Sequence, residues 1–230
     1  MLSLYLYAQQ VHSLWLNGAA GLNSNWILNQ NAYGNPEMEY STSFGFTCGV
    51  GVSYFISRGC GMSGSVLLTQ MGQNYSGMQA GALAKRKVQL IYLEFPLLVM
   101  RQIPNMRYPT WISAGPDIMI LTKARQEYNR DQGGTQLPNE EGMADGDITE
   151  RFKPVDIALN FSLNRMVELN YFRSIMLLFS INSSLRLLDI NSNEWQIPNT
   201  QNIYQPSHNF YIGAKIGLMF KVARFGGGHW

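Results

Sequence analysis

A few charged side chains are the only candidates for acid–base chemistry in this sequence. Glu94, Asp117, Asp156, Lys215 and Lys221 each occupy the small or polar face of a segment whose other face is apolar. Two carboxyl groups held close together can act as a general acid and a general base, because each changes the pKa of the other. Carboxylates and lysines also form structural ion networks. Since no nucleophile or substrate cleft accompanies these residues, we expect a structural network and no catalytic residue.

The cysteines and histidines indicate no metal or cofactor site. The chain has two cysteines, Cys48 and Cys60, and three histidines, His12, His208 and His229, which lie apart from both cysteines. A disulfide scaffold would be richer in cysteine, and a zinc site needs clustered ligands. We therefore expect no metal and no cofactor.

Much of the charge lies in one part of the chain. Of the 32 charged residues, 11 fall between Arg125 and Lys153. Within this stretch, Glu140–Asp147 (EEGMADGD) has the oxygen density of a calcium loop but lacks the spacing and the bidentate glutamate of a defined calcium motif. We expect a solvated acidic loop.

The composition excludes several classes of protein. Charged residues make up 14% of the chain and hydrophobic residues 46%, with a mean hydropathy of −0.12, whereas soluble domains carry roughly 25% charged residues. The hydrophobic content excludes a disordered chain. The longest apolar run is Ile175–Phe179, and a membrane helix needs about 20 apolar residues. The net charge of +2 comes from scattered Lys and Arg, so we expect no nucleic-acid partner.

Hydrophobic residues recur with a period of two. In residues 210–222 every second side chain is apolar, and the residues between them are small or charged at most positions, which is typical of a β-strand. Many of these segments are about ten residues or longer, as a membrane-spanning strand requires, whereas soluble strands most often have about 5–6 residues. The eight candidate strands are residues 14–27, 43–54, 62–72, 89–99, 110–123, 155–163, 173–186 and 210–222.

The connections between these strands alternate between long and short. Outer-membrane barrels show this order, with long loops outside the cell and tight turns in the periplasm. We therefore predict an all-β fold, an eight-stranded antiparallel up-and-down transmembrane β-barrel of the outer membrane. An even number of strands places both termini in the periplasm.

The N-terminus, MLSLYLYAQQ, is apolar, and no charged residue precedes Glu37. These features favour residues 1–9 as the remainder of a signal peptide and residues 10–230 as a single barrel domain. The alternative is that this segment is the first strand of a cytosolic protein.

Aromatic residues gather where the predicted strands meet the loops, as in the interfacial girdles of membrane barrels. These residues are Trp15, Trp26, Tyr40, Tyr54, Tyr108, Trp111, Tyr128, Phe152, Tyr171, Phe172, Phe210 and Tyr211.

The predicted turn near Asn105 brings Glu94 nearly opposite Asp117, with Lys215 at mid-height on the last strand. An eight-stranded barrel is only wide enough for side chains to fill. Because buried charges must be paired, we expect an ion-paired plug and no channel. The same turn places Pro96 and Pro116 nearly opposite each other, where one local kink or bulge would accommodate both.

Two of these strands also carry a family resemblance. The pair YLEFPLL (Tyr92–Leu98) and WISAGPDI (Trp111–Ile118), with the segments WLNGAAGLN and LLTQMGQ (which ends after Gly72) and a glycine-rich last strand, resembles PorT-like outer-membrane β-barrel proteins of Bacteroidetes. The resemblance implies an eight-stranded outer-membrane barrel. One founding member of that family takes part in type IX protein secretion, and the family offers no catalytic residues to transfer.

The last strand resembles the signal that barrel assembly machinery reads: a polar residue, a glycine, an aromatic residue and a hydrophobic residue. Lys215, Gly217, Phe220 and Val222 occupy these positions. We therefore expect outer-membrane lipid and barrel assembly machinery as partners, with secretion-machinery subunits as further candidates.

The leading hypothesis is a small, closed, non-enzymatic outer-membrane barrel with a structural, adhesive or secretion-associated role. One alternative is an outer-membrane enzyme acting on lipids or peptides, for which Ser207 and His208 are the nearest candidates. Another is a soluble lipocalin-like ligand-binding barrel with its apolar face inward.

Overall fold

The computed structural model describes residues 12–28, 38–79, 81–106, 108–138, 145–169, 175–196 and 203–225, and these are almost entirely β-strand. The short 3-10 helices η1 (Thr149–Arg151) and η2 (Asn193–Trp195) lie between strands, and no helix in the described ranges is long and apolar enough to cross a membrane. The strands are β1 (Ser13–Leu28), β2 (Glu39–Ser41), β3 (Ser43–Ser57), β4 (Cys60–Gln79), β5 (Ala82–Gln102), β6 (Thr110–Gln132), β7 (Thr135–Leu137), β8 (Gly146–Asp147), β9 (Val155–Glu168), β10 (Ile175–Arg186) and β11 (His208–Arg224).

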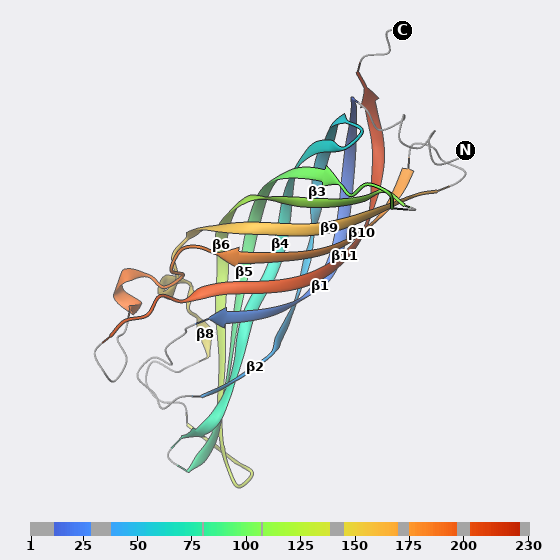
Figure 1. The fold of residues 1–230 in the computed structure, drawn as a ribbon. Helices are drawn as coiled ribbons and strands as arrows, with labels where there is room; N and C mark the ends of the chain where they lie inside the picture. Colours follow the sequence, from blue (N-terminus) through green and yellow to red (C-terminus); the bar gives the residue numbers. More distant parts are fainter. Residues whose placement is uncertain are drawn as a thin grey trace, which may run out of the picture.

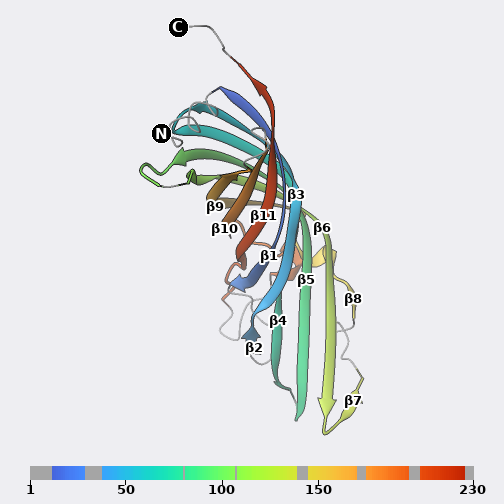
Figure 2. The same ribbon diagram turned by 90° about the vertical axis from the view of Figure 1, so that its right-hand side faces the viewer.

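Eight long strands form a closed ring, and every pairing in the ring is antiparallel. The order is β1, β3, β4, β5, β6, β9, β10 and β11, and β11 pairs again with β1. Each strand thus lies beside its neighbours in the chain, and Figures 1 and 2 show them wrapped around one axis. The predicted eight-stranded up-and-down barrel is confirmed.

The alternation in sequence separates the outside of the barrel from its lumen. On β11, Ile212, Ile216 and Phe220 are 46%, 55% and 42% exposed, whereas Tyr211 and Met219 are buried. The other ring strands repeat this pattern, so most of the exposed large apolar side chains form a belt around the barrel. An apolar surface of this extent is not stable in water. The orientation of the faces is therefore that of a transmembrane barrel and the opposite of a lipocalin-like one.

The two prolines lie at irregularities in the pairing. Pro96 pairs with Asp117 and Val99 pairs with Ala114 in the same register, but the two pairs that would lie between them, at Gly115 and Pro116 of β6, are absent from this ladder. Proline has no N–H to donate to a neighbouring strand, which explains the interruption. The turn that joins these strands contains Asn105 in a left-handed conformation, with a φ of 61°.

Three strands are longer than the sequence pattern predicted. The stretches 73–88 and 125–132, expected to be loops, continue β4, β5 and β6 well past the rest of the ring, as Figure 2 shows. Beyond Thr69 of β4, β3 no longer pairs with β4, and beyond Ile120 of β6, β9 no longer pairs with β6. Residues 73–79 of β4, 82–88 of β5 and 125–132 of β6 thus form a three-stranded extension of the barrel. The short strand β2 pairs along its β4 edge, and β7 and β8 pair along its β6 edge. Both faces of the extension carry polar residues, so its sequence lacks the apolar–polar alternation of the barrel.

Several aromatic residues expected in the interfacial girdle are buried, Tyr128 in the extension and the others inside the barrel. Trp15, Trp111, Tyr128 and Tyr211 are 0–2% exposed, because they fall on the inward positions of their strands. Phe152 is buried as well, at 3% exposed. The girdle prediction is therefore wrong for these five residues. Tyr171 and Phe172 lie outside the described residues, as does the proposed signal peptide.

Gly72 allows β4 and β5 to approach closely where the extension begins. Its φ is 156°, and a Cβ at this position would lie 2.0 Å from the carbonyl oxygen of Val88. We expect Gly72→Ala to lower the free energy of unfolding by about 1–3 kcal/mol, as overpacking does in other cores. Urea unfolding in lipid vesicles, followed by tryptophan fluorescence, measures this change.

The matched control is Gly18→Ala, since the atoms nearest to a Cβ on Gly18 are 3.9 and 4.0 Å away. Equal unfolding free energies for the two variants would contradict this account of Gly72.

Candidate functional site

The middle of the lumen holds a buried ion pair. Nη1 of Arg186, on β10, lies 2.8 Å from Oδ2 of Asp156, on β9, and the two side chains are 1% and 2% exposed. The Arg186 guanidinium also lies 4.0 Å from the centroid of the Tyr92 ring on β5, and its Nη2 lies 3.2 Å from Sδ of Met71 on β4. One side chain thus connects four strands across the barrel.

The two predicted lumen carboxylates lie beside this ion pair. Glu94 and Asp117 are both fully buried, and they are diagonal neighbours because Asp117 pairs with Pro96, two residues after Glu94. The Tyr211 hydroxyl donates to Glu94 (3.4 Å), and Nδ2 of Asn160 donates to Asp117 (3.2 Å). Lys215, on β11, is within electrostatic range of both carboxylates. The structure thus brings four of the five predicted network residues, Asp156 included, into one polar layer.

Lys221 lies elsewhere. Its Nζ is 5.8 Å from the centroid of the Trp15 ring, and the charged groups that act on it are Arg224 and Glu168. Lys221 is six residues beyond Lys215, near the end of β11. Its distance from the polar layer follows from this position, so the structure does not bring it into the network.

Apolar clusters close the lumen on both sides of the polar layer. The cluster at the end that holds the turn near Asn105 consists of Trp15, Phe55, Met100, Trp111, Met166, Met176 and Met219. The cluster at the other end includes Met71, Tyr75, Val88, Leu90, Met119, Leu121, Tyr128, Ile148, Phe152 and Ile190. Between the clusters lies a cavity of about 70 Å³, whose lining includes five serines, three asparagines and Lys215. The lumen has the packing of a plug.

Sequence reasoning missed the residues that organise the polar layer. Arg186, Tyr92 and Tyr211 all occupy inward positions, and alternation alone could have assigned them there. Arg186 ends a strand, and Tyr211 was expected in the girdle. Tyr92 was placed on the same face as Glu94, but it was not expected to take part in the network.

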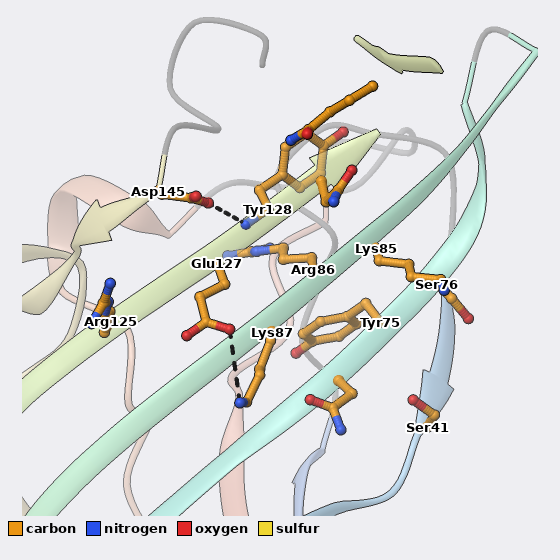
Figure 3. A pocket seen from close by; sticks show the side chains of 13 residues that line it. Ser41, Tyr75, Ser76, Lys85, Arg86, Lys87, Arg125, Glu127, Tyr128 and Asp145 are labelled. Atoms are coloured by element: carbon orange, nitrogen blue, oxygen red, sulfur yellow. Dashed lines mark hydrogen bonds and ion pairs between the residues drawn. The ribbon is translucent and has the colours of Figure 1, made fainter. Parts of the chain in front are cut away.

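A second polar site lies on the outer face of the extension (Figure 3). A pocket of about 670 Å³ is bordered there by β4, β5 and β6. Lys85 and Lys87 of β5 and Arg125 of β6 line it, together with Glu127 and Asp145. The rest of the lining consists of Ser41, Asn74, Tyr75, Ser76, Arg86, Tyr128, Asn129 and Gln136.

The acidic groups of this pocket are already bound. Glu127 forms an ion pair with Lys87 (3.8 Å), and Oδ1 of Asp145 accepts a hydrogen bond from the Tyr128 N–H. Within the described ranges, neither Lys85 nor Arg125 forms an ion pair with a carboxylate. The pocket can therefore attract an anionic group through these two cations.

A family model describes the same architecture. The model named "Outer membrane protein beta-barrel domain" matches residues 7–190. The chain belongs to this outer-membrane β-barrel family. Its location is the outer membrane, in agreement with the apolar belt around the barrel. The comparison does not single out the PorT-like proteins within this class.

Solved structures of outer-membrane proteins are similar to the barrel at low identity. Neisserial surface protein A is 12% identical, with a TM-score of 0.42, and the match covers 91% of this chain and 97% of that protein. Ail of Yersinia pestis, in complex with the heparin analogue sucrose octasulfate, is 10% identical, with a TM-score of 0.41 and coverages of 90% and 99%. OprG of Pseudomonas aeruginosa is 9% identical, with a TM-score of 0.38 and coverages of 93% and 98%. No curated protein sequence matches the chain significantly.

The predicted assembly-signal residues of this barrel all lie on β11. Phe220 and Val222 face outward and are 42% and 62% exposed. Gly217 faces the lumen, where a Cβ would lie 2.3 Å from the carbonyl oxygen of Gly18 on β1. Lys215 faces the lumen as well. The signal thus lies on the strand that closes the ring with β1.

The structure describes only part of the acidic loop, and the rim residues Ser207 and His208 each have a polar neighbour. Residues 139–144 lie outside the described ranges, and in the rest no three His, Cys, Asp or Glu residues group as metal ligands. Nδ1 of His208 lies 3.0 Å from the Leu188 carbonyl oxygen, and Ser207 Oγ accepts a hydrogen bond from Asn191.

Removing one member of the buried ion pair leaves the other charge without compensation. We expect Arg186→Gln to lower the free energy of unfolding by about 3–5 kcal/mol, and the double variant Arg186→Gln with Asp156→Asn to lower it less. Urea unfolding in lipid vesicles measures both values.

Lys221→Gln is the control, because it removes a cation outside the polar layer and should change the unfolding free energy by less than about 1 kcal/mol. If Arg186→Gln is no more destabilising than this control, Arg186 does not organise the lumen.

Proposed function

We propose that the protein is a closed, non-enzymatic outer-membrane barrel that presents its extension on the cell surface as an adhesive site for anionic groups. The observation that supports this most directly is the pocket beside Lys85 and Arg125, on a sheet that projects past a plugged barrel. The anionic group would be a sulfate, phosphate or carboxylate of a surface polysaccharide, since flexible lysines and a planar guanidinium bind such oxyanions.

The strand directions support an extracellular position for the extension. Ser13 of β1 pairs with Arg224 of β11, so both termini of the barrel lie at one end. The extension, with Gln79 and Ala82 near its tip, projects from the opposite end (Figure 1). In bacterial outer-membrane barrels the long loops face outward and the short turns face the periplasm. We therefore place the termini in the periplasm.

A secretion-associated role is a second candidate, supported by the resemblance of Tyr92–Leu98 and Trp111–Ile118 to PorT-like proteins. Purification from detergent-solubilised outer membrane tests it, because a secretion component should copurify with other subunits of the machinery. Barrel assembly machinery is a further proposed partner, through the last strand.

A plugged lumen should not conduct ions. In planar lipid bilayers we expect the purified barrel to give no discrete single-channel currents, because apolar clusters close both ends of the polar layer. Steady channel openings by the folded protein would contradict a closed barrel.

The adhesive proposal predicts charge-dependent binding to immobilised heparin. We expect Lys85→Gln with Arg125→Gln to weaken the Kd by about tenfold, the equivalent of roughly 1.4 kcal/mol. Binding should also weaken with added salt, which screens exposed charges. Biolayer interferometry with the detergent-solubilised full chain measures the Kd.

The matched control removes two cations at the other end of the barrel, Arg58→Gln with Arg224→Gln, and should leave the Kd unchanged. Equal effects of the two double variants, or no heparin binding by the unmodified protein, would contradict the proposal.

A further inference from the structure

The lipid-facing surface of the barrel is not uniform. An apolar groove of about 670 Å³ crosses the outside of β5, β6, β9, β10 and β11. Its lining includes Val99, Phe161 and Ile212, which are 57%, 52% and 46% exposed. The groove lies on the face that contacts lipid, far from the polar pocket of the extension.

The course of the groove follows from the strand register. Val99 pairs with Ala114, Ala114 with Phe161, Phe161 with Ser183, and Ser183 with Ile212. These residues therefore form one continuous row across five strands. The small side chains of Ala114 and Ser183 alternate with larger ones in this row, which produces a depression in the belt.

This row crosses the membrane obliquely. Val99 is near the end of β5 that leads to the turn at Asn105, whereas Ile212 is near the opposite end of the barrel. Four strand spacings of about 4.8 Å give a length of roughly 19 Å. Since the hydrocarbon core is about 30 Å thick, this length suits a single acyl chain from one leaflet.

A cation lies at the end of the groove that Val99 occupies. Arg101 also lines it and is the next outward residue of β5 after Val99. A Cβ on Gly59 would lie 3.9 Å from Nη1 of Arg101, so the guanidinium lies beside the turn between β3 and β4. In the described part of the chain, Arg101 forms no ion pair. The guanidinium is therefore available to a phosphate at the level of the lipid headgroups.

We propose that this groove binds an anionic glycerophospholipid, with one acyl chain along the row from Val99 to Ile212 and the phosphate on Arg101. The guanidinium at one end of an apolar groove matches the charge and the shape of such a lipid. The inference depends on the membrane position of the barrel and is independent of the proposed adhesive role.

Native mass spectrometry of the full barrel in detergent tests the proposal, with phosphatidylglycerol and phosphatidylcholine as probes. We expect one phosphatidylglycerol to be retained per barrel, in preference to phosphatidylcholine. Arg101→Gln should reduce the retention of phosphatidylglycerol about tenfold and change that of phosphatidylcholine little. Arg58→Gln, which removes a cation from the neighbouring turn, should have no effect.

Filling the groove tests the acyl-chain part separately. Ala114→Phe should reduce the retention of both lipids, whereas Ala20→Phe, the same change at an exposed position of β1 outside the groove, should not. Folding of each variant is checked by gel electrophoresis, in which a folded barrel changes its mobility when the sample is heated and an unfolded one does not. If Ala114→Phe fails to fold, Ser183→Leu is used in its place. Equal retention of the two lipids, or no effect of filling the groove, would overturn the proposal.

Discussion

Closure of the sheet is the constraint on which the rest of the structure depends. Lipid offers no hydrogen-bond partner to backbone groups, so a β-protein can cross a membrane only as a ring without edges. The pairing of β1 with β11 completes that ring. With eight strands the ring encloses a lumen no wider than its own side chains. Every inward residue must therefore pack against inward residues of other strands.

The charge distribution follows from this narrow lumen. A lone arginine in such an interior would be strongly destabilising, whereas Arg186 is compensated by Asp156 and covered by Tyr92. Glu94 and Asp117 are held by hydrogen bonds from Tyr211 and Asn160. Outside the membrane the constraint is relaxed, and charged residues occupy both faces of the extension. One chain thus has two polar regions with different physical roles.

The features that depend on alternation could be predicted from the sequence, and those that depend on contacts across the lumen could not. The eight strands and the inward positions of Glu94, Asp117 and Lys215 follow from a period of two. The distance of Lys221 from the network reflects height along β11, which alternation does not specify. The partnership of Arg186 with Asp156 depends on register between β9 and β10. The extension could not be predicted from alternation, because polar residues such as Lys85 and Arg86 occupy both of its faces.

The meeting of the first and last strands also has a kinetic consequence. Ser13 and Arg224 are partners in the ladder although almost the whole chain separates them. Contacts between residues so distant in sequence form slowly, because the chain must lose the entropy of a very long loop before they contribute. Until β11 arrives, β1 exposes an unpaired edge that can bind other chains. The barrel therefore depends on being shielded from aggregation until its first and last strands pair.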